Sequence, residues 1–224
     1  MFLKKSAALA ENKFHIIPNG FDEDDFQKEE NRPEELFLIT YVGSIADNYN
    51  PELFFNVLDQ VRKNFPEIKF RLRFVGSMPA SIKNLVNSNR LEEITEYISN
   101  VSHEQAIRYM QSSTLLLLLI PEVPNNEGIL TGKLFEYLAS RRLIIGLGPK
   151  NGKASNIIDE CESGKMFERD EKDELGTYFK EMILRWKEKK ELLNFNITYS
   201  KYSRKEQAKM LSSIILENHS KAKY

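Results

Sequence analysis

Hydrophobic residues along the chain fall into short continuous runs, separated by stretches in which they recur every three or four positions. The runs predict strands at 36–42, 70–75, 94–99, 114–120, 143–147 and 165–167. The helical spacing predicts helices at 50–61, 81–92, 102–112, 131–140, 154–161, 173–193 and 203–217. Strands that alternate with helices predict an α/β fold, a Rossmann-like three-layer parallel sheet with helices on both faces.

The start of the chain departs from this alternation. A short helix at 1–10, a strand-like run at 14–17 and a turn at 18–20 precede a polar stretch at 22–35. This pattern is typical of an entry segment or linker. The apolar stretch after Lys4 and Lys5 is too short for a signal peptide.

Composition narrows the class of protein. The chain has 224 residues, 41% of them hydrophobic and 29% charged, as in ordinary globular proteins. A formal net charge of -1 gives no electrostatic footprint for nucleic acid. The single cysteine, Cys161, excludes an internal disulfide and a zinc cluster, so we expect a neutral helix residue in a cytoplasmic protein. The apolar run at 115–120 is too short to span a membrane.

Gly43 and Ser44 close the first predicted strand and precede a helix. In parallel sheets ligands bind at the carboxyl ends of the strands, where helix N-termini point. Glycine there lets the backbone approach a phosphate, and exposed N–H groups bind the anion. A simple tight turn explains the same two residues, so both interpretations stay open.

Thr131, Gly132 and Lys133 stand at a helix start that follows a buried strand. Free N–H groups, a hydroxyl and an ammonium would converge there, which suits a diphosphate. Glu136 follows about one turn later, where a carboxylate accepts ribose hydroxyls in dinucleotide sites. The alternative is a helix capped by Thr131 with an ordinary surface pair of Lys133 and Glu136.

The sequence argues against two motifs, a P-loop at 128–134 and a metal-binding acidic pair at 22–24. A P-loop would need one more residue between Gly128 and Gly132, and Leu134 stands where Ser or Thr would bind magnesium. The acidic triplet at 22–24 follows a turn rather than a buried strand, so we expect it to cap a helix start and to bind no metal.

Three segments, in order, resemble glycosyltransferase family 4: residues 16–22 (IIPNGFD), 41–44 (YVGS) and 131–139 (TGKLFEYLA). The resemblance implies the C-terminal, nucleotide-sugar-binding half of a GT-B fold. It implies that Glu136 holds the ribose and that backbone groups of Asn100 and Val101 line the base pocket. The residues implied around the diphosphate are Gly43, Ser44, Thr131, Gly132 and Lys133.

The resemblance also implies an activity, the transfer of a hexosyl group from a nucleoside diphosphate sugar to an acceptor hydroxyl in polysaccharide biosynthesis. No cofactor or metal is expected besides the donor. The partner implied is an acceptor-binding N-terminal domain, in cis or in trans, which would associate with the inner face of the membrane. No catalytic residue is assigned, since His15 and His103 stand in patterns that predict structural roles.

The chain departs from the family pattern in several places. Many members carry two acids with seven residues between them, but Gly128 stands eight positions before Glu136 and Glu127 is one position off. The Arg and Lys that many members place after the first glycine are missing from 44–50. Lys133 is the candidate replacement for their charge.

The predicted domains follow from the same resemblance. Residues 1–35 are expected to be a remnant of the N-terminal domain or a linker, residues 36–195 the donor-binding domain, and residues 196–224 the crossover helix. The apolar residues of the crossover at 199–204 are expected to be partly orphaned. We therefore expect a fragment or split form of an enzyme that transfers no sugar alone; a non-catalytic nucleotide-sugar-binding or interaction module is the alternative.

Overall fold

The computed structural model describes residues 14–27, 35–99, 101–189 and 192–221. This part of the chain folds around a six-stranded sheet in the order β3-β2-β1-β4-β5-β6, in which all neighbouring strands are parallel. The strands are β1 (Leu36–Val42), β2 (Lys69–Val75), β3 (Thr95–Ile98), β4 (Leu115–Leu119), β5 (Leu143–Leu147) and β6 (Gly164–Phe167). The predicted Rossmann-like fold is confirmed.

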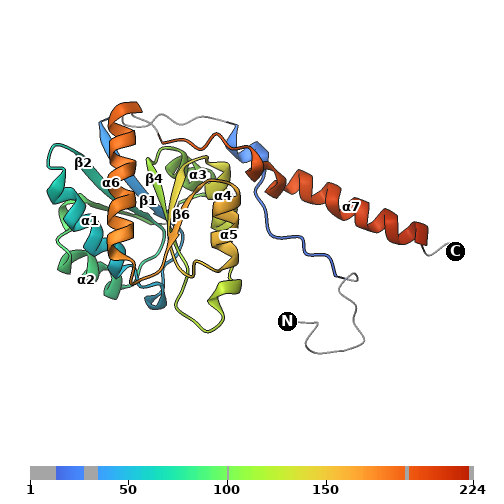
Figure 1. Cartoon of the computed structure of the whole chain (residues 1–224), viewed down its shortest axis with the longest axis horizontal. Coiled ribbons are helices and arrows are strands. Elements are labelled where there is room, and N and C mark those ends of the chain that lie inside the picture. The colour runs from blue at the N-terminus through green and yellow to red at the C-terminus, as the bar shows by residue number, and fades with distance from the viewer. Residues whose placement is uncertain (1–13, 28–34, 100, 190–191, 222–224) are drawn as a thin grey trace.

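Helices cover both faces of the sheet, as Figure 1 shows. One face carries α1 (Glu52–Asn64), α2 (Ala80–Ser88) and α6 (Lys172–Lys189). The other face carries α3 (His103–Gln111), α4 (Gly132–Ala139) and α5 (Lys153–Glu160). The predicted three-layer arrangement is therefore correct.

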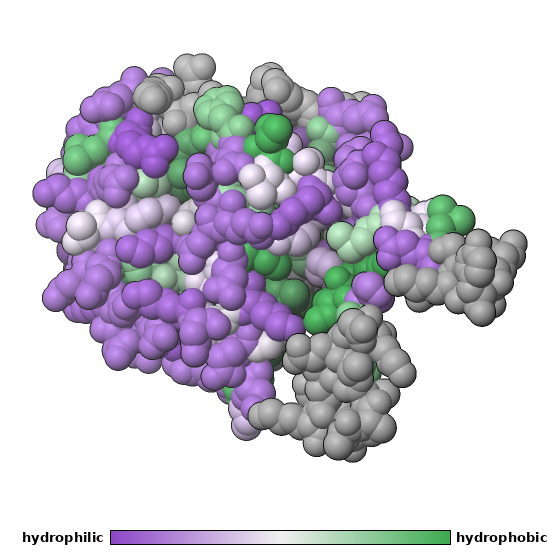
Figure 2. Space-filling model, turned by 45° about the vertical axis from the view of Figure 1, so that its right-hand side comes forward, coloured by the Kyte–Doolittle hydropathy of each residue, from purple (hydrophilic) through white to green (hydrophobic). Residues whose placement is uncertain are grey.

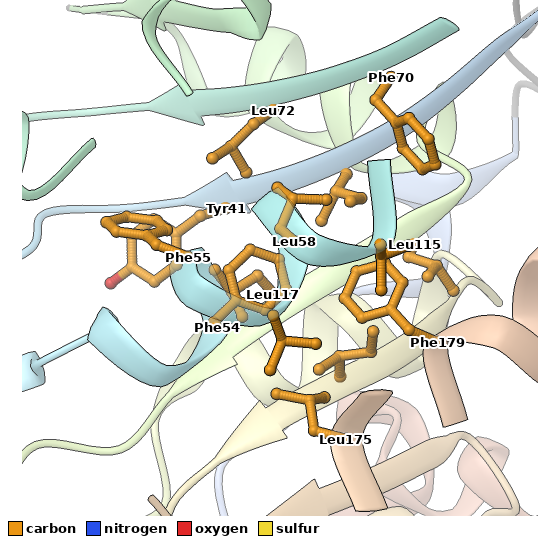
Figure 3. Close-up of a cluster of buried hydrophobic side chains, with 14 of the residues drawn as sticks. Tyr41, Phe54, Phe55, Leu58, Phe70, Leu72, Leu115, Leu117, Leu175 and Phe179 are labelled. Atoms are coloured by element: carbon orange, nitrogen blue, oxygen red, sulfur yellow. The ribbon is translucent and has the colours of Figure 1, made fainter. Parts of the chain in front are cut away.

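Strand β4 shows why the sheet has two cores. Leu115 and Leu117 point to the α1 and α6 side, while Leu116 and Leu118 point to the α4 and α5 side. All its residues are buried, as expected for a strand covered on both faces. Figure 3 shows the first core, in which Phe residues of α1 and α6 pack on these leucines.

The start of α1 and the end of α2 differ from the prediction because of single residues with positive φ. Helix α1 begins at Glu52 with Pro51 as its N-cap, after the predicted start at 50, because Asn50 is in a left-handed conformation with φ 36°. Helix α2 ends at Ser88 rather than near 92, because Arg90 takes a left-handed φ of 58° that ends the helix. In both places one residue with a positive φ sets the boundary, at the start of α1 and after the end of α2.

Two other predictions were wrong, namely the end of the long helix and the strand at 14–17. The long helix predicted to reach 193 is α6, and Leu193 instead forms an isolated antiparallel bridge with Arg142. Residues 14–17 are not a strand, and Phe14 to Ile16 are exposed. The helix predicted at 1–10 lies outside the described residues.

The N-terminal segment is joined to the segment before α7 (Arg204–Lys221). The amide of Phe21 donates to the carbonyl of Tyr202 (3.2 Å), and the amide of Arg204 donates to the carbonyl of Phe21 (2.8 Å). Tyr202 is buried, with its ring 5.4 Å from that of Phe135 on α4. The expectation that this crossover is orphaned is therefore wrong for Tyr202.

Helix α7 projects from the body of the molecule in Figure 1, and its apolar residues are exposed. The exposed fractions are 48% for Met210, 49% for Leu211, 58% for Ile215 and 65% for Leu216. Figure 2 shows apolar surface where α7 and the N-terminal segment extend from the body of the molecule. Among the described residues, no helix combines the length and the apolar character that crossing a membrane requires.

Candidate functional site

Two glycines close the central strands at the carboxyl edge of the sheet. Gly43 and Gly76 have φ of 115° and 127°, which side chains rarely adopt. A Cβ on Gly76 would lie 2.5 Å from the carbonyl oxygen of Gly43, so only glycine fits between the strand ends. The Gly43 amide donates to the Val75 carbonyl (2.7 Å). The turn thus brings the bare backbone of Gly43 to the edge of the sheet.

The ammonium of Lys133 lies directly against this glycine. A Cβ on Gly43 would be 3.0 Å from Lys133 Nζ. Lys133 Nζ donates to the hydroxyl of Tyr41 (2.5 Å) and lies 4.1 Å from the centre of the Tyr41 ring. The ordinary Lys133–Glu136 surface pair therefore does not describe the structure. Burial lowers the pKa of Lys133 from 10.5 to about 8, although Glu136 opposes the shift.

Tyr41 joins the core to this edge. Its ring packs 6.2 Å from that of Phe74, and Figure 3 shows its hydroxyl directed out of the cluster. The hydroxyl donates to the carbonyl of Ser44 (3.0 Å), whose own side chain is exposed. Burial raises the pKa of Tyr41, so the phenol stays neutral and orients Lys133 and the glycine turn together.

The start of α4 presents polar groups at the same edge. Thr131 is the N-cap residue, but its side chain makes no capping bond, which corrects the expected Thr131 cap. Its hydroxyl oxygen is buried without a hydrogen-bond partner among the described residues. Gly132 is exposed, and a Cβ there would be 3.2 Å from Asn19 Nδ2. The turn at 18–20 therefore lies beside the N–H groups that begin α4.

Glu136 lies one turn further along α4, with 29% of its side chain exposed. Burial raises its pKa; His103, Arg204 and Lys133 oppose the shift, and Asp25 adds to it. His103 Nδ1 is 3.9 Å from Glu136 Oε1. The sequence pattern of His103 pointed only to a helix start, and no local signal shows its proximity to α4.

The residues predicted for the site differ in whether the structure places them at the start of α4. Val101 is partly buried beside the α3 and α4 core, and Asn100 lies outside the described residues. Thr131, Gly132, Lys133 and Glu136 share one helix start, and Gly43 and Ser44 adjoin it through Lys133 and Tyr41. Glu127 is exposed on a short 3₁₀ helix, Asn126–Gly128.

Arg169 was not singled out from the sequence, yet it joins three loops at this edge. Its guanidinium donates to the carbonyls of Tyr49 (2.9 Å), Asn50 (3.2 Å) and Ile120 (2.7 Å). It also lies 3.5 Å from the carboxylate of Glu122. Since its Nε and Nη2 are engaged by these carbonyls, Arg169 fixes the loops relative to one another.

The acidic run near the N-terminus has a local role. Asp22 is the N-cap of a short 3₁₀ helix, Glu23–Phe26, and accepts from the amide of Asp24 (3.2 Å). Asp24 accepts from the side chain of Gln27 (2.7 Å). Over the described ranges, no three His, Cys, Asp or Glu side chains converge in a way that could hold a metal ion.

The edge thus combines groups suited to two parts of one ligand. Lys133, the Gly43 turn and the start of α4 offer positive charge and N–H groups, which suit a diphosphate. Glu136 offers a carboxylate, which accepts hydrogen bonds from hydroxyls. The two groups share one helix, so a nucleotide bound here would place its phosphates and its ribose one turn apart.

Comparison with known proteins connects this edge to a family. The family model for glycosyl transferases group 1 matches residues 22–193. No functionally curated protein matches the sequence.

Solved structures match the fold at low sequence identity. A glycosyltransferase from Rickettsia africae superposes with a TM-score of 0.72 at 15% identity, covering 96% of this chain and 60% of that one. Anabaena Alr3699/HepE in complex with UDP gives 0.69 at 12%, covering 91% and 57%. The C-terminal domain of a group 1 glycosyl transferase from Francisella tularensis gives 0.62 at 18%, covering 83% and 100%. The chain therefore spans about three fifths of the length of the first two proteins.

Proposed function

Because the chain belongs to the glycosyl transferases group 1 family, we propose that it is the donor-binding, C-terminal half of a GT-B enzyme of glycosyltransferase family 4. In this proposal residues 36–195 bind a nucleoside diphosphate sugar. Residues 196–224 are the crossover helix, and residues 1–35 come from the junction with the acceptor domain. The reaction is hexosyl transfer to an acceptor hydroxyl in polysaccharide biosynthesis.

One observation carries this proposal: α4 sets Lys133 against Gly43 while it presents Glu136 one turn away. The ammonium and the helix start would hold the diphosphate, and the carboxylate would hold the ribose. Ser44, Thr131 and Gly132 would complete the diphosphate site.

The base pocket and the acceptor side of the proposal rest on other features. The segment after β3, with Asn100 and Val101, would line the base. The exposed apolar residues of α7 support an acceptor domain that covers them, in cis or in trans. That domain would associate with the inner face of the membrane in the cytoplasm.

The proposal is tested by titration calorimetry with UDP, GDP, dTDP and ADP. Loss of a hydrogen bond to a charged group costs roughly 1.5–3 kcal/mol. Glu136→Ala should therefore weaken the best nucleotide about tenfold or more. Glu127→Ala is the matched control, since this exposed acid lies one position off the family spacing and should leave affinity unchanged. Equal affinities of Glu136→Ala and the unmodified chain would overturn the ribose assignment.

The same titration tests the expectation that no metal is needed. Affinity should be unchanged by EDTA and by Asp22→Asn with Asp24→Asn, because the positive charge comes from Lys133 and the start of α4. Affinity lost on chelation, restored by manganese, and already lost in the double variant would assign the chain to a metal-dependent transferase class.

A further inference from the structure

The imidazole of His103 lies between two carboxylates that come from distant parts of the chain. Its Nε2 is 3.1 Å from Oδ2 of Asp25, and its Nδ1 is 3.9 Å from Oε1 of Glu136. Asp25 lies in the N-terminal segment, His103 begins α3, and Glu136 lies on α4. The fold, and not a local motif, brings these side chains together.

His103 and Asp25 are each held in place by their own elements. The backbone at His103 is fixed by a capping box, in which Ser102 and Gln105 bond each other's backbone amides. Asp25 stands on the 3₁₀ helix Glu23–Phe26, whose Phe26 ring packs edge-on to the buried Phe21 at 6.1 Å. The hydrogen bond to Asp25 therefore sets the orientation of a ring that is otherwise 57% exposed.

Glu136 needs such support in its position. Burial raises its pKa, and Asp25 adds to that effect, whereas His103, Arg204 and Lys133 lower it. An ionised carboxylate accepts two hydroxyl hydrogen bonds, while a protonated one loses part of that capacity. His103 is the largest of the neighbouring influences that lower the pKa of Glu136, and its ring approaches the carboxylate from a neighbouring helix.

We propose that His103 is a positioning residue for Glu136: its ring, oriented by Asp25, holds the carboxylate where it accepts the ribose hydroxyls of a bound nucleotide. The inference rests on the proposed function. It gives the segment after the turn at 18–20 a part in nucleotide binding, since Asp25 acts on the ribose through His103. His103 itself touches no reacting atom.

The test compares ribose with 2′-deoxyribose, because a carboxylate that accepts both ribose hydroxyls discriminates against the sugar that lacks one. The dissociation constants of UDP and 2′-deoxyUDP are measured by calorimetry, together with the guanosine and adenosine pairs. The ratio of the two constants reports the ribose contact alone. The base and the diphosphate, which both nucleotides share, cancel from it.

The unmodified chain should prefer the ribonucleotide, and Glu136→Ala should abolish the preference. His103→Ala should reduce the preference roughly three- to tenfold, because a carboxylate that is no longer held in place should lose about one hydrogen bond to the ribose. Asp25→Asn should reduce it less, in the same direction. The matched control is Glu104→Ala, the next residue of α3, whose carboxylate pairs with Arg108 (2.7 Å); it should keep the full preference.

Thermal melting of each variant separates positioning from folding. If His103→Ala melts early, His103→Gln takes its place, since its amide keeps a polar group for Asp25 but lacks the imidazole ring that faces Glu136. A preference unchanged in a folded His103 variant overturns the inference while leaving the proposed function intact, provided that Glu136→Ala abolishes it. A preference unchanged in Glu136→Ala overturns the proposed ribose contact itself.

Discussion

The ammonium of Lys133 lies where burial opposes its charge. Its pKa falls to about 8, because the ring of Tyr41 and the turn at Gly43 replace water around it. A hydrogen bond to Tyr41 and the face of an aromatic ring offset only part of that cost. Such a group favours binding over stability, since the negative charge of a bound diphosphate would offset the cost of burying the ammonium.

Replacement of Lys133 should separate these two properties. Lys133→Met keeps the length of the side chain, so nucleotide affinity should fall about tenfold or more while the chain remains folded. In the unmodified chain, affinity should also fall as the pH rises through about 8, because the ammonium loses its proton. Calorimetry across pH, with Lys153→Met as the surface control, measures both effects.

The free energy of unfolding should change with pH in the direction opposite to that of nucleotide affinity. The folded pKa of Lys133 lies below the unfolded value, so the cost of its charge is fully present below pH 8 and declines as the pH rises toward 10.5. The Met variant should therefore melt at or above the unmodified chain near neutral pH, and the difference should shrink in alkali. A variant that melts lower throughout would show that the Tyr41 contact is net stabilising.

At the scale of elements, the loops at the carboxyl edge are joined by one side chain. Arg169 follows β6 and reaches carbonyls in the loop before α1 and at the end of β4. Only 17% of its side chain is exposed, so these bonds are partly shielded from water. The ring of Tyr49, whose carbonyl Arg169 holds, lies 5.8 Å from Lys133 Nζ. We call Arg169 and these three carbonyls the clamp; it is connected to the proposed diphosphate site through Tyr49.

Arg169→Lys tests the clamp. A single ammonium cannot serve all three carbonyls in the planar fork of a guanidinium, so carbonyls would be left unpaired. The free energy of unfolding in urea should fall by about 1–3 kcal/mol. Arg108→Lys, at an exposed pair on α3, should change it by less than about 0.5 kcal/mol. Equal losses in the two variants would contradict a clamp at Arg169.

The same scale shows what the sequence can predict. Continuous apolar runs placed β1 and β5 at their observed bounds, because a doubly covered strand must be apolar throughout. The capping-box pattern placed the start of α3 for an equally local reason. The end of α2 was missed, because nothing in the polar sequence around Arg90 requires a positive φ.

Residues of the candidate site are of two kinds: local sequence signals indicate some of them, and only the fold brings the others together. Gly43 and Lys133 could be selected from strand ends and helix starts, which are local signals. The contact of His103 with Asp25 and Glu136, and the reach of Arg169 across three loops, depend on the packing of distant elements. The unpartnered hydroxyl of Thr131 could not be predicted either, since the same residue type at an N-cap usually bonds the helix.

At the scale of the whole molecule, the described residues fold around one six-stranded sheet, which under the proposed function is one side of a two-sided cleft. The similar structures are longer, and the apolar residues of α7 are exposed where the helix leaves the body. Transfer between two substrates depends on holding both in a reactive geometry, which contributes much of the rate. Under the proposed function, donor binding and sugar transfer can therefore be tested separately.

We expect the 224-residue chain to bind a nucleotide sugar but to transfer no sugar by itself. The assay follows labelled donor incubated with candidate acceptors, using protein whose donor binding has been verified by calorimetry. Slow hydrolysis of the donor is compatible with this expectation. Rapid transfer by the purified chain, without a second protein, would show that the acceptor side is already present.

The order of the sheet has a consequence for how the chain emerges from the ribosome. Strands β1, β2 and β3 are made first and form one contiguous half, but β1 also pairs with β4, as Ile39 with Leu115. Until β4 is made, one edge of β1 stays unpaired, and such an edge is a template for another chain. Strand β4 covers that edge, but its own outer edge then stays unpaired until β5 is made. Vectorial synthesis therefore makes the edges of β1 and β4 the part of the sheet at risk of aggregation before β5 is added.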